Sequence, residues 1–418
     1  MESSRRIALR ALVRWRNGRE FADQIINQLL GKTSLSTANR GFALELFYGV
    51  LRNLTLLDFW IDQLRVGPLD PTSRDLLRLG LYQLFFLKTP PHAAVFETVA
   101  IASPRARKLV NAILRRAQRE QPALTTAAEA ASVRIRFSTP EFLVAKWTGQ
   151  FGAEATFELC HWNSRPAPIY ARINQLRTTA AEFLRRHPGS FLVPGKTNFA
   201  GLTNVTEVAE AGDGYIQDPS TAIACEMLQP RPGESVLDAC AAPGGKAAYL
   251  AEMMSNTGSL IAVDADAGRL RRLSENLSRL GVTNMRAVQC NWLDQASIHA
   301  AQFREPSFDR ILVDAPCTNT GVMRRRVDVR WRLRPNDFER MPRQQLAILR
   351  AVAPLLKPGG SLVYSTCSVE PEENREVIAS LLQACPDLRL TTQAEILPFC
   401  DHFDGAFSAR LHQGAPVE

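Results

Sequence analysis

The strongest constraint on the fold is a set of five short apolar runs in the C-terminal half of the chain. Segments with helical spacing separate these runs, and each run has the length of a strand. This alternation favours an α/β fold, a doubly wound, Rossmann-like parallel sheet with helices on both faces. Such sheets bind ligands beyond the carboxyl ends of their strands, so the residues after each run are candidate site residues. The runs are ESVLDA, SLIAVDA, MRAVQC, DRILVDAP and GSLVYSTC.

The N-terminal part has a different pattern. Between residues 5 and 117 apolar side chains recur at intervals of three and four, which predicts an all-helical bundle ending in the basic segment KLVNAILRRAQRE. Small and polar residues at 118–131 predict a linker, and short β-prone runs with Gly and Pro at 166–214 predict a small α+β subdomain. We therefore predict three domains: residues 1–125, all helical; residues 126–214, linker and small α+β subdomain; and residues 215–418, the α/β sheet.

Charge and cysteine usage limit the function. The chain has 50 basic and 42 acidic residues, and only seven of the basic residues are lysine. Arginine suits bidentate contacts with phosphate, so this bias fits a nucleic-acid partner. A GC-rich genome also replaces lysine with arginine and explains the bias as well. We expect no membrane span, because no apolar run is long enough, and no signal peptide, because arginines interrupt the N-terminal apolar run. The eight cysteines are then expected in a reducing cytoplasm, and their lack of CxxC spacing disfavours zinc ribbons and redox pairs.

A loop of small residues follows the first predicted strand. Asp238 closes the strand, and the turn at Pro243, Gly244 and Gly245 allows a ligand to approach the backbone closely. The loop has neither GxGxxG nor a phosphate-binding P-loop motif. Asp264 ends the second strand, at the distance expected of an acid that binds ribose hydroxyls. These features favour a ligand that contains adenosine, whereas a tight turn with a helix-capping Asp is the alternative.

Two cysteines follow neighbouring strands. Asp314 ends the fourth strand and is followed by Cys317, while Cys367 ends the fifth. A single cysteine is usually a small buried hydrophobe. Two of them at the same sheet edge, beside an acid and a nucleoside site, favour catalysis.

An arginine-rich segment separates the two cysteines. Six arginines lie around Trp331 and look like a clamp for backbone phosphates, namely Arg324, Arg325, Arg326, Arg330, Arg332 and Arg334. Trp331 is interpreted as an anchor for the loop, with stacking on a base as the alternative. The cluster CDHFDG near the C-terminus has no partner ligands with suitable spacing, so we expect a loop there and no metal.

Together these motifs resemble the S-adenosylmethionine-dependent RNA cytosine-C5 methyltransferases, and most of all the members that act on small-subunit (16S) ribosomal RNA. The resemblance covers nearly the whole chain. It rests on LDACAAPGGK, DAPC and YSTCSVEPEEN, with support from FSTPEFLVAKW, GYIQDPST and DGAFSARL. It implies a NusB-like RNA-binding domain at residues 1–125, a methyltransferase domain at residues 215–418, S-adenosylmethionine as cofactor and ribosomal RNA as substrate.

The resemblance also implies residue roles. Cys367 would be the nucleophile that adds to cytosine C6, Cys317 would assist release, and Asp314 would lie between cofactor and cytosine. Asp264 would bind the ribose. The methionine and ribose loop would comprise Cys240, Ala241, Ala242, Pro243, Gly244, Gly245 and Lys246. A thiolate on C6 makes C5 nucleophilic, which explains the need for a cysteine.

Two positions depart from the family pattern. Asn291 stands where the family has an Asp near the adenine, with Asp294 three residues on, and Ala247 replaces a threonine. The amide of Asn291 can still bind adenine, although its donors and acceptors differ from those of a carboxylate. We expect a monomer that binds RNA phosphates through arginine-rich surfaces. The same chemistry on tRNA, or a non-catalytic assembly factor, are the alternatives. DNA enzymes are disfavoured because they lack the Thr-Cys cysteine.

Overall fold

The computed structural model describes residues 3–203, 205–303 and 305–414, and it divides into two compact units. The first unit contains residues 1–166 together with the segment Met323–Arg332, and the second contains residues 167–322 and 333–418. Thus a short piece of the C-terminal half belongs to the N-terminal unit. No helix in the described ranges is both long and apolar enough to cross a membrane.

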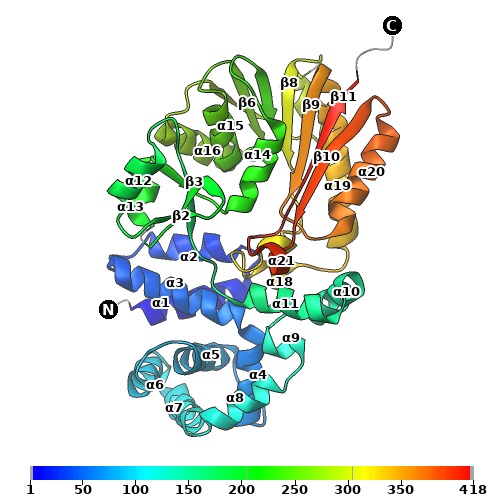
Figure 1. Ribbon diagram of the computed structural model, residues 1–418. Helices are drawn as coiled ribbons and strands as arrows, with labels where there is room; N and C mark the ends of the chain where they lie inside the picture. The colour runs from blue at the N-terminus through cyan, green and yellow to red at the C-terminus, as the bar shows by residue number, and fades with distance from the viewer. Residues whose placement is uncertain (1–2, 204, 304, 415–418) are drawn as a thin grey trace. The chain divides into compact units, whose positions relative to one another are not determined.

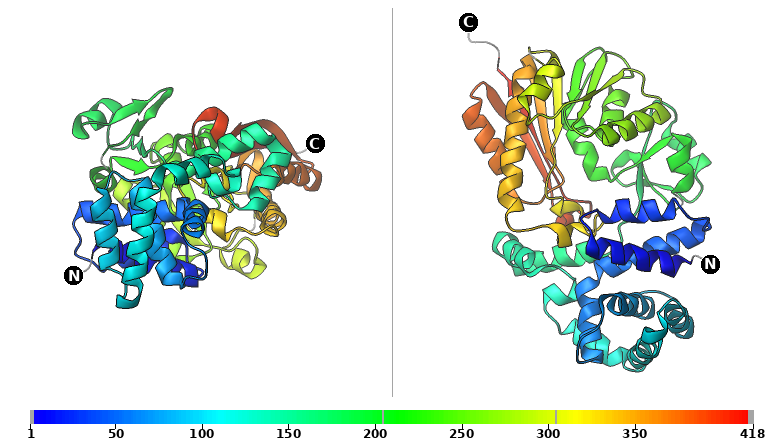
Figure 2. Two further views of the ribbon diagram at one scale, coloured as in Figure 1. Left: turned by 90° about the horizontal axis from the view of Figure 1, so that it is seen from below. Right: turned by 180° about the vertical axis from the view of Figure 1, so that it is seen from behind.

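The first unit is all helical, as predicted (Figure 1). Apolar residues three or four positions apart lie on one face of a helix, and here that face is buried. Leu46, Val50 and Leu57, for example, are inaccessible to solvent. Helices α5, α6 and α7 pack around one another, which Figure 2 shows from two further sides. The helices are α1 (Ser4–Asn17), α2 (Ala22–Leu30), α3 (Thr37–Arg52), α4 (Leu54–Leu64), α5 (Pro71–Phe85), α6 (Pro91–Ala100), α7 (Pro104–Arg119), α8 (Gln121–Glu129), α9 (Val133–Arg136), α10 (Glu141–Phe151), α11 (Ala153–Ser164) and α18 (Val329–Arg332).

Residues 118–131, interpreted from the sequence as a linker, are mostly helical. Helix α7 continues to Arg119, and α8 follows at Gln121–Glu129. Alanine is the best helix former, and Leu124 and Ala128 are buried. The small residues therefore form a helix here, with only Leu124 and Ala128 buried, rather than an irregular connection.

The second unit contains a small antiparallel sheet and a large mixed sheet, as the predicted α+β and α/β folds require. The small sheet has the order β2-β3-β1-β4. Its strands and helices are β1 (Tyr170–Ile173), α12 (Ala180–Arg186), β2 (Phe191–Val193), β3 (Lys196–Gly201), α13 (Thr206–Ala211) and β4 (Gly214–Ile216). Phe183 on α12 and Ile173 on β1 belong to the apolar core of this subdomain.

The large sheet has the order β10-β11-β9-β8-β5-β6-β7, in which β7, β6, β5, β8 and β9 run parallel. Strands β10 and β11 pair antiparallel at one edge. The five predicted strands are therefore confirmed, in a doubly wound arrangement. The strands are β5 (Ser235–Asp238), β6 (Ser259–Asp264), β7 (Met285–Gln289), β8 (Phe308–Asp314), β9 (Leu356–Thr366), β10 (Leu388–Ile396) and β11 (Ala406–Gln413).

Helices cover both faces of this sheet (Figure 1). One face packs on α14, α15 and α16, and the other packs on α19 and α20. Neighbouring strand residues alternate between the two cores, as Val236 and Leu237 do. The helices are α14 (Ile223–Leu228), α15 (Gly245–Met253), α16 (Ala267–Leu280), α17 (Gln295–Ala300), α19 (Asp337–Val352), α20 (Arg375–Ala384) and α21 (Pro398–Asp401), with the 3-10 turns η1 (Pro219–Ala222), η2 (Thr320–Val322), η3 (Ala353–Leu355) and η4 (Pro371–Glu373).

The arginine-rich segment is not the phosphate clamp that we predicted, because three of its six guanidinium groups are tied to the first unit. Arg330 is 1% exposed and donates to the carbonyl oxygens of Phe137 at 3.2 Å and Asn163 at 2.7 Å. Arg324 is buried and lies over the Trp162 ring at 3.8 Å. Side chains in such positions cannot meet a phosphate without leaving their partners.

The rest of the segment supports the same correction. Arg332 donates to three carbonyl oxygens, those of Trp15, Gly18 and Glu20. The Trp331 indole donates to the carbonyl oxygen of Leu51 at 2.9 Å, in agreement with its interpretation as an anchor. Only Arg326 and Arg334 are classed as exposed. The segment fastens itself to the helical unit by filling unpaired backbone acceptors.

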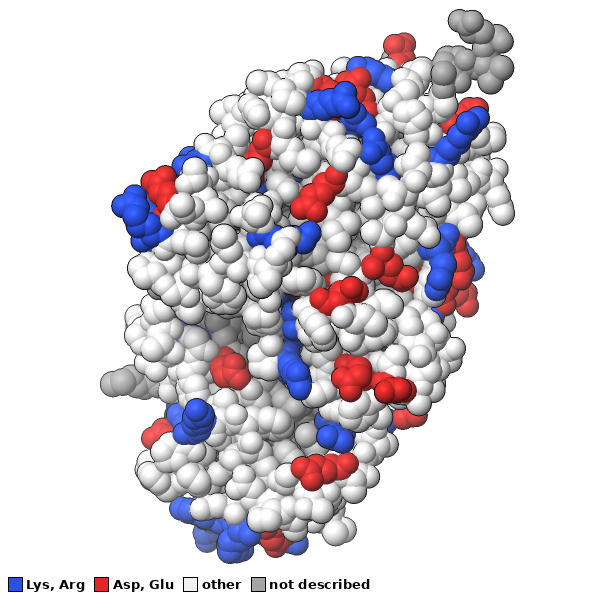
Figure 3. Space-filling view, viewed as in Figure 1, with Lys and Arg blue, Asp and Glu red and all other residues white. Residues whose placement is uncertain are grey.

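The basic side of α7, in contrast, is exposed. Figure 3 shows basic side chains at the lower end of the helical unit, where Figure 1 draws α7 and α8. The exposed basic residues of α7 are Arg105, Arg107, Lys108, Arg115, Arg116 and Arg119. These side chains are therefore accessible to solvent, unlike those of Arg324 and Arg330.

We predict that Arg330→Ala destabilises the first unit by roughly 2–4 kcal/mol, because the change strands buried carbonyl groups and opens a cavity. Arg326→Ala, at an exposed position of the same segment, should change stability by less than about 0.5 kcal/mol. Urea unfolding followed by tryptophan fluorescence measures this, since five of the six tryptophans lie in the first unit. Equal stability of the two variants would contradict the anchoring role.

Candidate active site

The two cysteines meet at one edge of the large sheet. Strands β8 and β9 pair in parallel with Asp314 opposite Ser365, so both chains leave the sheet at the same end. Cys317 and Cys367 follow within three residues, and their sulfur atoms are 3.3 Å apart. The expectation that the two strand ends bring the cysteines together is therefore met.

Asn319 fixes the environment of the thiols. Its side-chain oxygen accepts a hydrogen bond from the Cys367 thiol at 3.2 Å, and its amide nitrogen donates to the carbonyl oxygen of Cys317 at 2.8 Å. The hydrogen bond with Cys367 is the main reason why the pKa of the Cys317 thiol lies well above its ordinary value, and burial and the charges of Cys367 and Glu373 add to it. Cys317 thus keeps its proton while Cys367 is its neighbour.

A charged pair lies at the same sheet edge. Lys246 donates to the carboxylate of Asp314 at 2.8 Å, and the side chains are 15% and 33% exposed. Burial opposes the Lys246 charge, but the attraction of Asp314 outweighs burial and raises the pKa of Lys246 above its ordinary value. The pair therefore supplies a stable positive charge and a partly accessible carboxylate beside the thiols.

The loop from Cys240 to Lys246 crosses from β5 into α15 with little side-chain bulk. Gly244 has a φ of 107°, which favours glycine, and it caps the first turn of α15. The backbone N–H of Ala241 is hydrogen bonded to the carbonyl of Val263 at 2.8 Å, which holds the loop against the end of β6. The loop thus has the small side chains on which the predicted close approach of a ligand depends.

Asp238 is the functional candidate that the sequence analysis described without assigning it a role. It is 0% exposed, and neither carboxyl oxygen has a well-formed hydrogen bond to any described residue. Burial, followed by the charge of Asp314, raises the pKa of Asp238 to about 7, although Lys246 opposes the shift. A buried carboxyl with so few partners is costly to ionise. Its position before the small-residue loop was visible in the sequence, but its lack of partners was not.

Asp264 and Asn291 lie at the ends of the next two strands. Asp264 is 5% exposed, accepts from the backbone N–H of Asp266 at 3.0 Å and pairs with Arg269 at 3.2 Å. Asn291 is exposed, and its side-chain oxygen accepts from Leu293 at 3.1 Å. Asp294 caps α17 instead, through Ala296.

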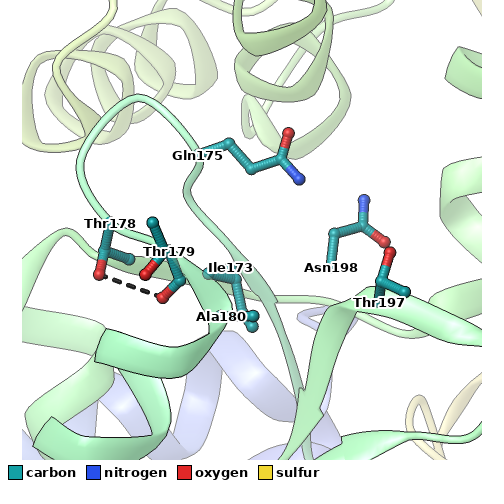
Figure 4. A pocket seen from close by; sticks show the side chains of 7 residues that line it. All are labelled: Ile173, Gln175, Thr178, Thr179, Ala180, Thr197 and Asn198. Carbon is teal, nitrogen blue, oxygen red and sulfur yellow. Dashed lines mark hydrogen bonds between the residues drawn. The ribbon is translucent and has the colours of Figure 1, made fainter.

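A pocket of about 300 Å³ lies in the small α+β subdomain, and none of the predicted site residues lines it (Figure 4). In Figure 4, Thr197 and Asn198 lie on one side of it, Thr178, Thr179 and Ala180 lie on the other, and Gln175 extends toward Asn198. Its lining is neutral and consists of Ile173, Gln175, Thr178, Thr179, Ala180, Thr197 and Asn198. Sequence reasoning had no signal for it, because these residues come from separate turns and strands.

Comparison with known proteins places this geometry in a family. A family model described as 16S rRNA methyltransferase RsmB/F matches residues 225–411, and the NusB family model matches residues 2–119. A model described as an RsmF/B-like ferredoxin-like domain matches residues 139–186. A probable ribosomal RNA small subunit methyltransferase B from Bacillus subtilis is 37% identical over 402 residues, which cover 92% of this chain and 89% of that protein. The chain belongs to the ribosomal RNA small subunit methyltransferase B family.

Further relatives agree with this assignment. A family member from Klebsiella pneumoniae is 34% identical and is covered over 98% of its length. A methyltransferase homologue from Pyrococcus horikoshii is 30% identical, with a TM-score of 0.58, and covers 67% of this chain. The structure of NSun6 from the same organism, solved with SFG, has a similar fold with a TM-score of 0.59 and 20% identity. The resemblance inferred from the motifs is confirmed at the level of the family.

We predict that Asp238→Asn raises the free energy of unfolding over wild type by an amount that grows from about pH 4 to about pH 7. In wild type the pKa of Asp238 is higher in the folded than in the unfolded state, so the folded protein loses stability as the pH rises from the unfolded to the folded pKa. Above the folded pKa the loss stays constant, and Asp238→Asn avoids it. The full difference should be on the order of 4 kcal/mol. Urea unfolding followed by circular dichroism at several pH values measures it.

The exposed Asp387→Asn provides the control for this measurement, and its difference from wild type should not depend on pH in the same way. A difference for Asp238→Asn that is the same at pH 4 and pH 8 would show that its carboxyl is not held in the destabilised charged form.

Proposed function

We propose that the protein transfers a methyl group from S-adenosylmethionine to C5 of a cytosine in 16S ribosomal RNA. The observation that carries this proposal is the 3.3 Å approach of Cys317 and Cys367 beside the Lys246–Asp314 pair. Membership of the small-subunit ribosomal RNA methyltransferase B family supports the class of substrate.

The carboxylates of the site fit the methyl donor. S-adenosylmethionine carries a sulfonium and an ammonium group, and when bound it supplies a methyl group activated by the positive sulfur. The orphaned carboxyl of Asp238 suits the ammonium group, and Asp264 suits the ribose hydroxyls. Cys240 to Lys246 would surround the methionine and ribose parts, and Asn291 would meet the adenine.

The chain's own residues supply the activation of cytosine. The Cys367 thiolate adds to C6, so a C6–S bond forms and the electrons of the C5–C6 double bond make C5 nucleophilic. Negative charge that develops at N3 needs a proton. Lys246 donates to Asp314 at 2.8 Å, so this pair can deliver a proton to N3. Because Asp314 is one-third exposed, it can reach a ring placed over the thiols.

Cys317 acts after methyl transfer. The hydrogen bond with Cys367 is the first cause of the raised pKa of Cys317. Once Cys367 is bonded to C6, that sulfur no longer carries the charge that holds the Cys317 proton, so Cys317 loses it more readily. Cys317 gives its proton to solvent, and its thiolate then removes the proton from C5. The electrons of that C–H bond re-form the C5–C6 double bond, the C6–S bond breaks, Cys367 leaves as a thiolate, and N3 returns its proton to the Lys246–Asp314 pair. The state of Cys367 thereby controls the protonation of Cys317.

The RNA would be held by the exposed basic face of α7, since the buried arginines of residues 324–332 are unavailable. Phosphate contacts make affinity depend steeply on salt. The target cytosine must be unstacked, because an enzyme cannot reach C5 and C6 of a stacked base from both ring faces.

Asp264→Ala should weaken donor binding by about 1–3 kcal/mol, because the ribose hydroxyls lose a buried acceptor. Isothermal titration calorimetry with the methyl donor measures this change. Asp266→Asn is the matched control: Asp266 lies two residues away, is exposed, and keeps its helix-capping role as Asn. A folded Asp264→Ala protein with wild-type affinity would place the ribose elsewhere.

The two cysteines should give opposite results when each is changed to alanine. Cys367→Ala should abolish methylation and leave no covalent RNA complex, because no nucleophile attacks C6. Cys317→Ala should still attack and methylate, but it should release product slowly and accumulate a covalent protein–RNA species that depends on the donor. Denaturing gels of labelled RNA detect that species, and bisulfite sequencing reports the methylated position.

Accumulation in Cys367→Ala rather than in Cys317→Ala would reverse the two roles. Full activity of both variants would exclude the covalent mechanism.

A further inference from the structure

A buried carboxylate lies between the two loops that carry the cysteines. Glu373 ends the turn η4 and is 0% exposed. It lies in the motif YSTCSVEPEEN, but neither the donor site nor the proposed reaction steps use it. Burying a carboxylate is costly unless donors surround it, so its partners indicate its role.

Each carboxylate oxygen of Glu373 accepts two hydrogen bonds. Oε2 accepts from the backbone N–H of Thr318 at 2.9 Å and from the Gln345 amide at 2.7 Å. Oε1 accepts from the Thr318 hydroxyl and from the Ser368 hydroxyl, the latter at 2.8 Å. Thr318 follows Cys317, and Ser368 follows Cys367. One carboxylate therefore holds the residue next to each thiol.

Glu373 is itself held in place. The Tyr364 hydroxyl donates to its backbone carbonyl at 2.6 Å. Gln345, on α19, also donates to the carbonyl of Pro316 at 3.0 Å, which fixes the residue before Cys317. The contact is thus anchored in β9 and α19 rather than in the loops that it joins.

We propose that Glu373 is a positioning residue that sets the separation of the Cys317 and Cys367 thiols for their successive steps. The inference rests on the proposed function, since it assigns both thiols to one reaction. Glu373 acts through Thr318 and Ser368, its hydrogen-bond partners. Displacing a reacting group by about 1 Å can cost about 100-fold in rate, so a clamp on both loops has a large effect.

The chemistry of the partners predicts how substitutions behave. At Oε2 both partners can only donate, so an acceptor oxygen is required there. At Oε1 both partners are hydroxyls, which can accept as well as donate. Glu373→Gln can therefore place its oxygen at the first position and its amide nitrogen at the second. Glu373→Ala removes the clamp, and Glu373→Asp is one methylene too short to hold both loops.

The experiment measures thiol proximity without RNA and catalysis with RNA. Dibromobimane becomes fluorescent when it alkylates two neighbouring thiols, so its rate on the full-length protein reports their separation, with Cys317→Ala as background. Steady-state methylation gives kcat and KM. The matched control is Glu376→Ala, which removes an exposed carboxylate from the first turn of α20.

We expect Glu373→Ala and Glu373→Asp to lower the bridging rate roughly tenfold and kcat about 100-fold, with the KM for RNA within about threefold. Glu373→Gln and Glu376→Ala should stay within about threefold of wild type in both measurements. If Glu373→Ala fails to fold, Glu373→Asp, which keeps the charge, tests the same loss of reach.

Two results would overturn the proposal: a folded Glu373→Asp protein with wild-type bridging, or a loss of kcat without any loss of bridging. A wild-type protein whose thiols are bridged rapidly, but which methylates no RNA, would refute the proposed function and leave the positioning of the thiols intact.

Discussion

Strands β8 and β9 pair in parallel with Asp314 opposite Ser365, and the chemistry at the sheet edge depends on that register. The ladder continues past the strands, since the backbone N–H of Ala315 is hydrogen bonded to the carbonyl of Ser365 at 2.9 Å. A shift of one residue would turn the side chains of one strand to the opposite face. Cys317 and Cys367 would then no longer face each other, whatever contacts their loops could make.

Charge is divided between the two units. The sheet edge gathers the carboxyls of Asp238, Asp264 and Asp314 together with two cations, since Lys246 pairs with Asp314 and Arg269 pairs with Asp264. The same carboxylates repel the phosphates of RNA. Under the proposed function, the exposed basic face of α7 would attract RNA, while the sheet edge would attract the donor.

The sequence allowed the sheet, its strand ends and both cysteines to be predicted, because short apolar runs and short motifs are local signals. Glu373 could not be predicted as a clamp, since its partners Thr318 and Gln345 are 55 and 28 residues away. The arginine segment was misread for the same reason: Arg330 finds its acceptors 193 and 167 residues away, and an arginine in a sequence looks equally suited to a phosphate or a carbonyl. Burial and partners of polar groups are settled by tertiary packing rather than by residue type.

The segment Met323–Arg332 also has a consequence for how the chain is made. Asp328 accepts the backbone N–H of Ala22 at 2.8 Å, and Val327 belongs to the apolar core of the helical unit. A ribosome that has synthesised residues 1–166 has therefore made a helical unit that still lacks part of its core. That unit is completed only after β5, β6, β7 and β8, four strands of the other unit's large sheet, have been synthesised, while β9 is still to come. The last steps of folding of the N-terminal unit are thus coupled to synthesis of the middle of the sheet. A gene for the first unit alone would have to add residues 323–332 to residues 1–166. A gene for the second unit alone would have to bridge the gap that these ten residues leave.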